Sequence, residues 1–324
     1  MQYFVSKNHN QLNSRVFAPE SVTKRICLNP KYNVTLGRKA PSAEVLLDSG
    51  AFQDIKKSER LTCQGALGRQ IDYEDRIGFE SKYIVSYDRI VDESPTVQGK
   101  RRKRRVSLST AERYVDQTVE AAKYLADQRD ELAPRRLVLS NQGVNPEQYL
   151  GCVKEILRFA EPQDVIGLGG FCIIGQIPRF TNDYIKVVRD VLPLLAKKRI
   201  RRLHIFGVGV FKTLIWTHVM CSRFGITPSY DTSSLELNAV YGRSFTPDLH
   251  GVGPSGVHLT SVFSKEEKYK FYHPRDWAIL NIEVVNEFWR RLNRLYPIAS
   301  EDEARISESG RLRGIPSPHQ VSLP

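Results

Sequence analysis

Short apolar segments alternate with longer amphipathic segments along most of the chain. The short segments are rich in Val, Ile, Leu, Tyr and Phe, which is typical of parallel strands covered on both faces. We therefore expect strands at Gln2–Val5, Arg25–Leu28, Glu44–Leu47, Lys82–Ser86, Arg136–Leu139, Asp164–Leu168, Leu203–Phe206 and Ile226–Tyr230.

The longer segments repeat their apolar residues at helical spacing, which predicts helices at Ser109–Asp130, Asn145–Phe159, Thr181–Lys198 and Val210–Phe224. Strands that alternate with helices predict βαβ units and a parallel sheet. Eight strands within about 250 residues fit an α/β fold of the (β/α)8 TIM-barrel type. A doubly wound sheet is the alternative, because periodicity does not separate the two.

The pattern changes near His250. A Gly- and Ser-containing stretch at His250–Ser264 predicts a loop, and Arg275–Tyr296 predicts one long amphipathic helix. A polar tail follows Pro297. We therefore expect a catalytic barrel over residues 1–249 and a short C-terminal helical extension over residues 250–324.

Composition narrows the setting of this 324-residue chain. It has no apolar run of about 18 residues and no signal peptide at its start, so we expect a cytoplasmic protein without a membrane partner. Its five cysteines form no Cys-x-x-Cys pair, and its histidines are scattered. We therefore expect no disulfide scaffold, no metal site and no cofactor.

The net charge points to a class of partner. With 48 Lys and Arg against 36 Asp and Glu, the chain carries a formal charge of +12. Such an excess favours a polyanion such as DNA or RNA, although it does not select a fold.

Polar or glycine residues come directly after several of the predicted strands, where a barrel carries its catalytic face. These stretches read DSGAFQ from Asp48, YDRIVDE from Tyr87, SNQGV from Ser140, GLGG from Gly167, FGVG from Phe206 and SYDTSS from Ser229. Each one alone is weak evidence, since glycines often make tight turns and aspartates often cap helices. Their order and spacing are more specific than any single member.

The set resembles the tRNA-guanine transglycosylase superfamily, whose barrel carries Asp-Ser-Gly-Gly-(Phe/Tyr)-Gln, Asp-Glu, Val-Gln-Gly-Gly, Gly-Gly-Leu, Met-Gly-Val-Gly and Phe-Asp motifs in this order. The resemblance implies that Asp231 is the nucleophile, which attacks the anomeric carbon of the sugar and forms a covalent glycosyl intermediate. It also implies that Asp48 is the general acid and base that serves the departing and incoming bases.

The same resemblance implies a base pocket. Phe52 and Phe206 match the positions that stack on the two faces of the base, and Asp88 and Gln142 match those that read its edge. The other positions that match the family's substrate-binding motifs are Ser49, Gly50, Gly143, Gly167, Leu168 and Gly207. An alternative alignment of YDRIVDE would replace Asp88 by Asp92 or Glu93.

The chain departs from the family in ways that favour one branch. The family's zinc-binding cysteines are absent after Asp231, so no zinc subdomain is expected, and no acidic residue follows closely after GLGG to serve an aminomethyl amine. The chain is therefore most similar to the DNA-guanine transglycosylase branch of bacteria and phages. This implies exchange of guanine in DNA for a 7-deazaguanine base such as 7-cyano-7-deazaguanine, with protection from restriction nucleases and with accessory DNA-modification proteins as further partners.

Three alternatives stay open: base exchange in tRNA, a catalytically silent nucleic-acid-binding relative, and an unrelated barrel enzyme with chance matches. The positive charge offers a further clue. Lys100, Arg101, Arg102, Lys103, Arg104 and Arg105 are six consecutive cations in a predicted strand-to-helix loop. We expect this basic segment to contact nucleic-acid phosphates at the catalytic face, whereas Lys197–Arg202 precedes a strand and should lie on the opposite face.

Overall fold

The computed structural model describes most of the chain in separate stretches. They are residues 1–6, 24–31, 43–54, 61–93, 96–97, 100–101, 104–105, 107–171, 178–232, 235, 238–239, 243–246, 255–258 and 274–298. The polar tail after residue 298, as well as Arg102 and Lys103 of the basic segment, lies outside these residues.

Eight parallel strands form a closed barrel in the order β1-β12-β11-β10-β9-β4-β3-β2. They are β1 (Gln2–Ser6), β2 (Arg25–Leu28), β3 (Glu44–Leu47), β4 (Tyr83–Val85), β9 (Arg136–Asn141), β10 (Val165–Leu168), β11 (Arg202–Ile205) and β12 (Thr227–Thr232). The barrel closes where β1 pairs with β12, with Phe4 opposite Asp231. This closure confirms the predicted TIM barrel and excludes the doubly wound sheet.

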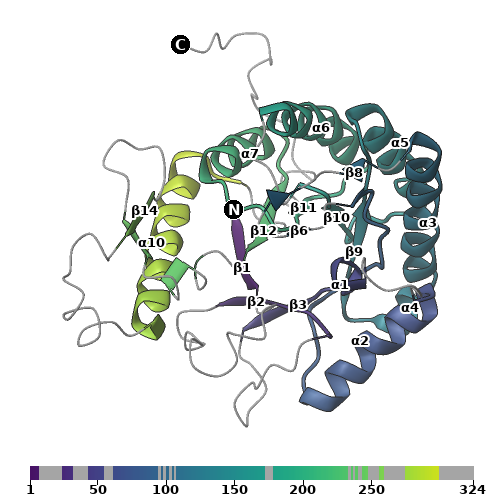
Figure 1. Cartoon of the computed structure of the whole chain (residues 1–324), viewed down its shortest axis with the longest axis horizontal. Coiled ribbons are helices and arrows are strands. Elements are labelled where there is room, and N and C mark those ends of the chain that lie inside the picture. The colour runs from purple at the N-terminus through teal and green to yellow at the C-terminus, as the bar shows by residue number, and fades with distance from the viewer. Residues whose placement is uncertain are drawn as a thin grey trace, which may run out of the picture.

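The longer helices lie around the outside of the strands, whereas the short α1 (Ala51–Asp54) lies at the strand ends inside this ring (Figure 1). The other helices are α2 (Cys63–Ile77), α3 (Leu108–Asp127), α4 (Arg129–Leu132), α5 (Pro146–Ile156), α6 (Pro178–Lys197), α7 (Phe211–Arg223) and α10 (Pro274–Leu295). The start of α5 follows the sequence pattern, because the Asn145 side chain accepts a hydrogen bond of 2.8 Å from the Gln148 backbone N–H. In the described part of the chain, no helix is long and apolar enough to cross a membrane.

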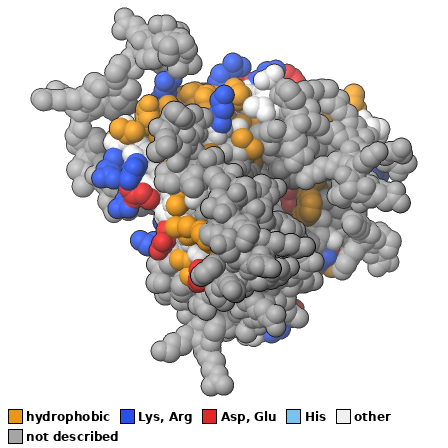
Figure 2. Space-filling view, turned by 60° about the vertical axis from the view of Figure 1, so that its left-hand side comes forward, with side chains coloured by type: hydrophobic (Ala, Val, Ile, Leu, Met, Phe, Trp, Pro, Cys, Tyr) orange, Lys and Arg blue, Asp and Glu red, His pale blue; other side chains and the backbone are white. Residues whose placement is uncertain are grey.

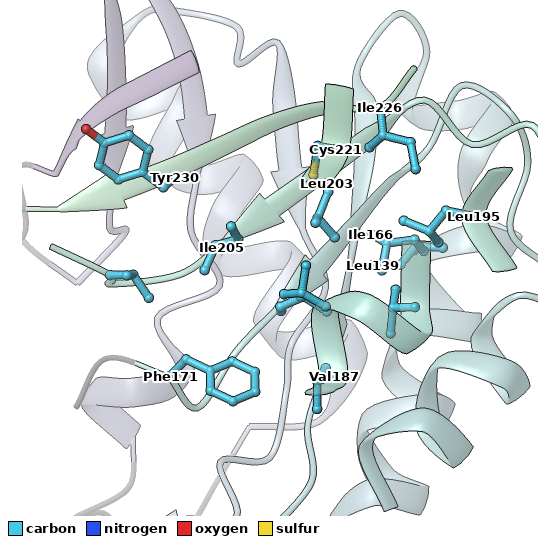
Figure 3. Close-up of a cluster of buried hydrophobic side chains, with 14 of the residues drawn as sticks. Leu139, Ile166, Phe171, Val187, Leu195, Leu203, Ile205, Cys221, Ile226 and Tyr230 are labelled. Atoms are coloured by element: carbon cyan, nitrogen blue, oxygen red, sulfur yellow. The ribbon is translucent and has the colours of Figure 1, made fainter. Parts of the chain in front are cut away.

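Two apolar layers hold the barrel together. Figure 3 shows the outer layer, where Leu139, Ile166 and Leu203 of neighbouring strands lie with Val187 and Leu195 of α6. A second cluster contains residues of the strands alone, which places it inside the barrel; its members are Phe4, Cys27, Leu46, Tyr83, Val85, Val138 and Val165. The two clusters follow from the alternation of side chains along each strand.

Three features differ from the sequence-based expectation. Helix α2 escaped prediction because the residues that it buries include the polar Gln70 and Glu74, which weakens its apolar periodicity. The predicted loop at His250–Ser264 contains strand β14 (Ser255–His258), which pairs with β13 (Arg243–Thr246). Small and polar residues gave that strand little β signal.

The third difference concerns the basic segment, whose described residues belong to two short antiparallel strand pairs, here called the ribbon, where the sequence predicted a loop. Strand β5 (Asp92–Glu93) pairs antiparallel with β8 (Arg104–Arg105), and β6 (Thr96–Val97) pairs antiparallel with β7 (Lys100–Arg101). The ribbon follows β4 and precedes α3, so it belongs to a connection at the carboxyl ends of the barrel strands.

Candidate active site at the carboxyl ends of the barrel strands

Polar side chains gather above the apolar interior of the barrel. Because side chains alternate along a strand, a residue two positions after an inward apolar one also faces the barrel axis. Phe4 is followed in this way by Ser6, and Leu46 by Asp48. Asp231 lies on the neighbouring β12, and Ser6 and Asp231 make direct contact. The carboxyl ends of β1, β3 and β12 thus build one polar cluster.

Asp231 is an almost completely buried carboxylate that receives several hydrogen bonds. Its Oδ2 accepts one of 2.6 Å from Ser6 Oγ, and its Oδ1 accepts one of 2.9 Å from the Gly207 backbone N–H. His204 Nε2 lies 3.3 Å from the same Oδ1. Burial alone would raise the pKa of Asp231, but the hydrogen bond and charge of His204 and the other donors outweigh it and hold this pKa below its usual value.

Asp48 lies in the opposite electrostatic situation. Its burial, together with the negative charges of Asp231 and Asp88, raises the pKa of Asp48 to about 7. Hydrogen bonds from the Ser49 backbone N–H and from Asn29 Nδ2, both 2.8 Å long, oppose this rise. The carboxyl group can therefore hold or release a proton near neutral pH.

Asp88 and Gln142 form a pair at the ends of β4 and β9. The Gln142 amide donates a hydrogen bond from Nε2 to the Asp88 carboxylate, and Asp88 is also close enough to raise the pKa of Asp48. Gln142 Oε1 is buried and has no hydrogen-bond partner among the described residues. Of the alternatives considered in the YDRIVDE stretch, Asp88 is thus the one with a described contact to Gln142, whereas Asp92 belongs to the ribbon strand β5.

The two predicted stacking residues differ in their surroundings. Phe206 packs on the barrel interior beside His204, with 4.5 Å between ring centroids, and a Cβ atom on Gly167 would approach its ring to 2.7 Å. Glycine at position 167 therefore makes room for this ring. Phe52 on α1 is 59% exposed, which leaves its ring available to a ligand.

A hydrogen bond and ion pairs hold the turn that follows β3 in place. Ser49 is buried, and its carbonyl accepts a hydrogen bond from Arg69 Nη2. Arg69 and Lys31 both pair with the buried Asp54, and Arg69 Nη2 would be 2.7 Å from a Cβ atom on Gly50. These ion pairs fix the turn that carries Asp48.

The remaining predicted residues act through their backbone atoms or leave room for a neighbouring backbone. Gly207 has a φ of +68°, which favours glycine, and this conformation aims its N–H at Asp231. A Cβ on Gly143 would come within 2.6 Å of the Tyr149 backbone nitrogen, so this glycine lets the start of α5 approach closely. The Leu168 side chain is buried in the outer layer, and its carbonyl accepts a hydrogen bond of 3.0 Å from the Phe206 N–H.

Sequence reasoning missed three residues that support the carboxylates: Ser6, Asn29 and His204. Each is buried, with an exposed fraction of at most 2%. Ser6 directly follows the first predicted strand, Asn29 directly follows the second, and His204 lies two residues before Phe206. A search for polar residues at inward positions of every predicted strand, extended to the residue that follows it, would have found them.

On the face that Figure 2 shows, the described charged groups are dispersed. Figure 2 shows Lys and Arg side chains in small groups, several of them beside Asp or Glu, where the view shows described residues. On α10, for example, Arg290 and Arg291 both pair with Glu287. Among the described residues, no group of three or more His, Cys, Asp or Glu could hold a metal ion.

Comparison with protein-family models and with curated proteins found no match for this chain.

Proposed function

We propose that the protein exchanges guanine in DNA for a 7-deazaguanine base through a covalent intermediate on Asp231. The observation that carries this proposal is a pair of neighbouring carboxyl groups whose pKa values are pushed apart, to below the usual range for Asp231 and to about 7 for Asp48. Such a pair suits a reaction that needs one ionised nucleophile and one proton carrier near neutral pH.

The two half-reactions mirror each other. A lone pair of Asp231 forms a bond to the anomeric carbon, while the glycosidic bond breaks and its electron pair leaves with guanine, which takes a proton from Asp48. The incoming base then attacks the same carbon and gives its proton to Asp48, and the Asp231 carboxylate leaves. No water is consumed, and the protein returns to its starting state.

The base would lie between the exposed ring of Phe52 and the ring of Phe206. The Asp88 carboxylate accepts hydrogen bonds from the donor edge of a guanine-like base, and Gln142 Oε1, which has no partner among the described residues, offers a further acceptor. A base in a duplex must leave the stack to reach this pocket. The absence of an acid after GLGG favours a neutral 7-substituent, as in 7-cyano-7-deazaguanine.

DNA is favoured over tRNA for two reasons. The sequence lacks the family's zinc-binding cysteines after Asp231, and the basic segment belongs to a connection at the carboxyl ends of the strands, where Asp231 also lies. Cations in that connection would attract phosphates next to the site. Replacement of guanine by a modified base in DNA would protect that DNA from restriction nucleases.

The test is incubation of the protein with radiolabelled guanine and either duplex DNA or tRNA. We expect label in DNA and none in tRNA, and no label in DNA with the Asp231→Ala variant. The matched control is Asp190→Asn on the surface of α6, which should keep the wild-type rate. Label in tRNA alone would replace the DNA assignment by tRNA, and label in neither would contradict base exchange.

A further inference from the structure

The hydrogen bonds on Asp231 distinguish its two oxygen atoms. Each carboxylate oxygen has two in-plane lone pairs. Oδ1 faces two donors, the Gly207 N–H at 2.9 Å and His204 Nε2 at 3.3 Å. Oδ2 faces one donor among the described residues, Ser6 Oγ at 2.6 Å. One lone pair of Oδ2 is therefore left to form a new bond.

The orientation of His204 is fixed independently of Asp231. Its ring packs edge-on against Phe4 and Phe206, with 5.8 Å and 4.5 Å between ring centroids, and its Nδ1 lies 2.9 Å from Ser229 Oγ. His204 itself is completely buried. The ring can therefore present only Nε2 to the carboxylate.

The hydrogen on Nε2 follows from the same contacts. An ionised carboxylate only accepts hydrogen bonds, so an attractive contact requires Nε2 to carry a hydrogen. Ser229 Oγ permits this, since it can donate to Nδ1 of a neutral ring or accept from Nδ1 of a charged ring while donating to the Leu203 carbonyl at 3.2 Å. In both arrangements Nε2–H points at Oδ1.

We propose that His204 is a positioning residue that holds Oδ1 of Asp231 and thereby makes Oδ2 the atom that bonds to the sugar. This inference rests on the proposed base exchange. When the Oδ2 lone pair forms the bond to the anomeric carbon, Oδ1 becomes the carbonyl oxygen of the glycosyl ester. It then still accepts from the Gly207 N–H and from His204 Nε2–H.

The two donors matter most in the second half-reaction. As the incoming base attacks, the bond from the anomeric carbon to Oδ2 breaks, and its electron pair returns to the carboxylate. Negative charge develops over both oxygens, and donors already aimed at Oδ1 stabilise it without reorganisation. His204 thus makes Asp231 a better leaving group and shortens the life of the intermediate.

The charged and titratable groups around His204 are few in the described part of the chain. Asp231 faces it from β12, and Phe4 faces it from β1 without charge. Tyr83 of β4 and Arg202 of β11 line a small cavity together with His204. Arg202 Nη1 donates a hydrogen bond of 3.2 Å to the Tyr83 hydroxyl. A change of Asp231 titration in a His204 variant would therefore report mainly the loss of the Nε2 donor.

The experiment compares wild type, His204→Phe and His204→Gln, with His218→Phe as the matched control. His218 is also a completely buried histidine, but it bonds to the Met1 amine and the Tyr296 carbonyl, away from Asp231. Carbon-13 NMR follows the titration of the Asp231 carboxyl, assigned with Asp231→Asn. For the covalent adduct, the protein is first mixed with guanine-containing duplex DNA, and guanine is then added. Samples quenched after increasing times follow the decay of the adduct.

In His204→Phe, we expect the Asp231 carboxyl to titrate at higher pH and the covalent adduct to decay about 10²-fold more slowly. His204→Gln, which keeps an N–H donor, should recover part of both effects, and His218→Phe should change neither. An unchanged titration and adduct decay in His204→Phe would overturn the proposal. If His204→Phe does not fold, Ser229→Ala, which frees the ring, should shift both measurements in the same direction, and no shift would overturn the proposal.

The two proposals fail separately. If wild type forms no adduct, base exchange is wrong and the leaving-group role falls with it, whereas the titration still decides whether His204 holds the Asp231 carboxylate. If the adduct forms on Asp231 but decays equally fast in His204→Phe, base exchange stands and the His204 proposal is wrong.

Discussion

Asp48 and Asp231 lie in one barrel mouth but in different local environments. Three donors among the described residues point at Asp231 and hold its pKa low, whereas Asp48 is close to two other carboxylates, which help to raise its pKa to about 7. Two identical side chains thereby become suited to different tasks, which is how active sites divide acid and nucleophile roles.

Asp48→Asn tests this environment by pH. The pKa of Asp48 is raised on folding, so the stability that its proton contributes is fully present below about pH 4 and is lost as pH rises through about 7. The neutral variant should therefore match wild type at pH 4 and be more stable by about 4 kcal/mol at pH 8. Urea unfolding at both pH values measures the difference.

The same variant should lose base exchange by about 10²-fold or more, because Asn carries no transferable proton. Asp190→Asn serves as the control and should keep the wild-type exchange rate. A wild-type exchange rate in Asp48→Asn would contradict the acid–base role.

The sequence motifs predicted both carboxylates, but some of the residues that donate hydrogen bonds to them were not predicted. Asp48, Asp88 and Gln142 stand in motifs with a recognisable order, so they could be found from spacing. Ser6 and His204 stand in no such motif, and their contacts with Asp231 depend on how β1 and β11 pair with β12. Register between strands distant in sequence is not encoded in either local stretch.

In the ribbon, the two strand pairs differ in whether cationic residues lie opposite acidic ones. Asp92 lies opposite Arg105 and Glu93 opposite Arg104, whereas Lys100 and Arg101 lie opposite the uncharged Val97 and Thr96. Opposite charges on directly paired positions attract each other. Phosphate binding should therefore depend more on Lys100 and Arg101 than on Arg104 and Arg105.

Replacing Lys100 and Arg101 by Ser should weaken duplex binding and lower the slope of log affinity against log salt by about 0.9 for each lost phosphate contact. Replacing Arg104 and Arg105 should have a smaller effect. The exposed Lys197 and Lys198 at the end of α6 are the control pair. Fluorescence anisotropy at several salt concentrations measures all three, and an equal loss from the control pair would contradict the assignment of faces.

Some of the helices and strands were predicted from the sequence, and others were not. All eight barrel strands were expected, because each is a short apolar run that is covered on both faces. The strands of the ribbon and β14 were not, since two-residue pairings and small residues leave no periodic signal. Helix α2 was missed because it buries polar side chains.

At the level of the whole molecule, the last described helix contacts the last barrel strand. Trp289 of α10 is 3% exposed, and its Nε1 donates a hydrogen bond of 2.7 Å to the hydroxyl of Tyr230, the neighbour of Asp231. Helix α10 therefore packs directly on the strand that carries the proposed nucleophile.

Trp289→Ala should lower the free energy of unfolding by about 3–5 kcal/mol, because a large buried side chain and a hydrogen bond are lost. Trp289→Phe keeps most of the packing and should lose less. Urea unfolding measures both, with Arg290→Ala on the exposed face of α10 as the control. A loss in Trp289→Ala no larger than in Arg290→Ala would contradict the role of this contact.

Detection of the covalent intermediate tests the central claim most directly. The protein is mixed with guanine-containing duplex DNA, quenched with denaturant, digested and analysed by mass spectrometry. We predict a deoxyribosyl-linked adduct on Asp231 that disappears when excess guanine is added before the quench. An adduct on another residue, or full base exchange by Asp231→Ala, would contradict the account.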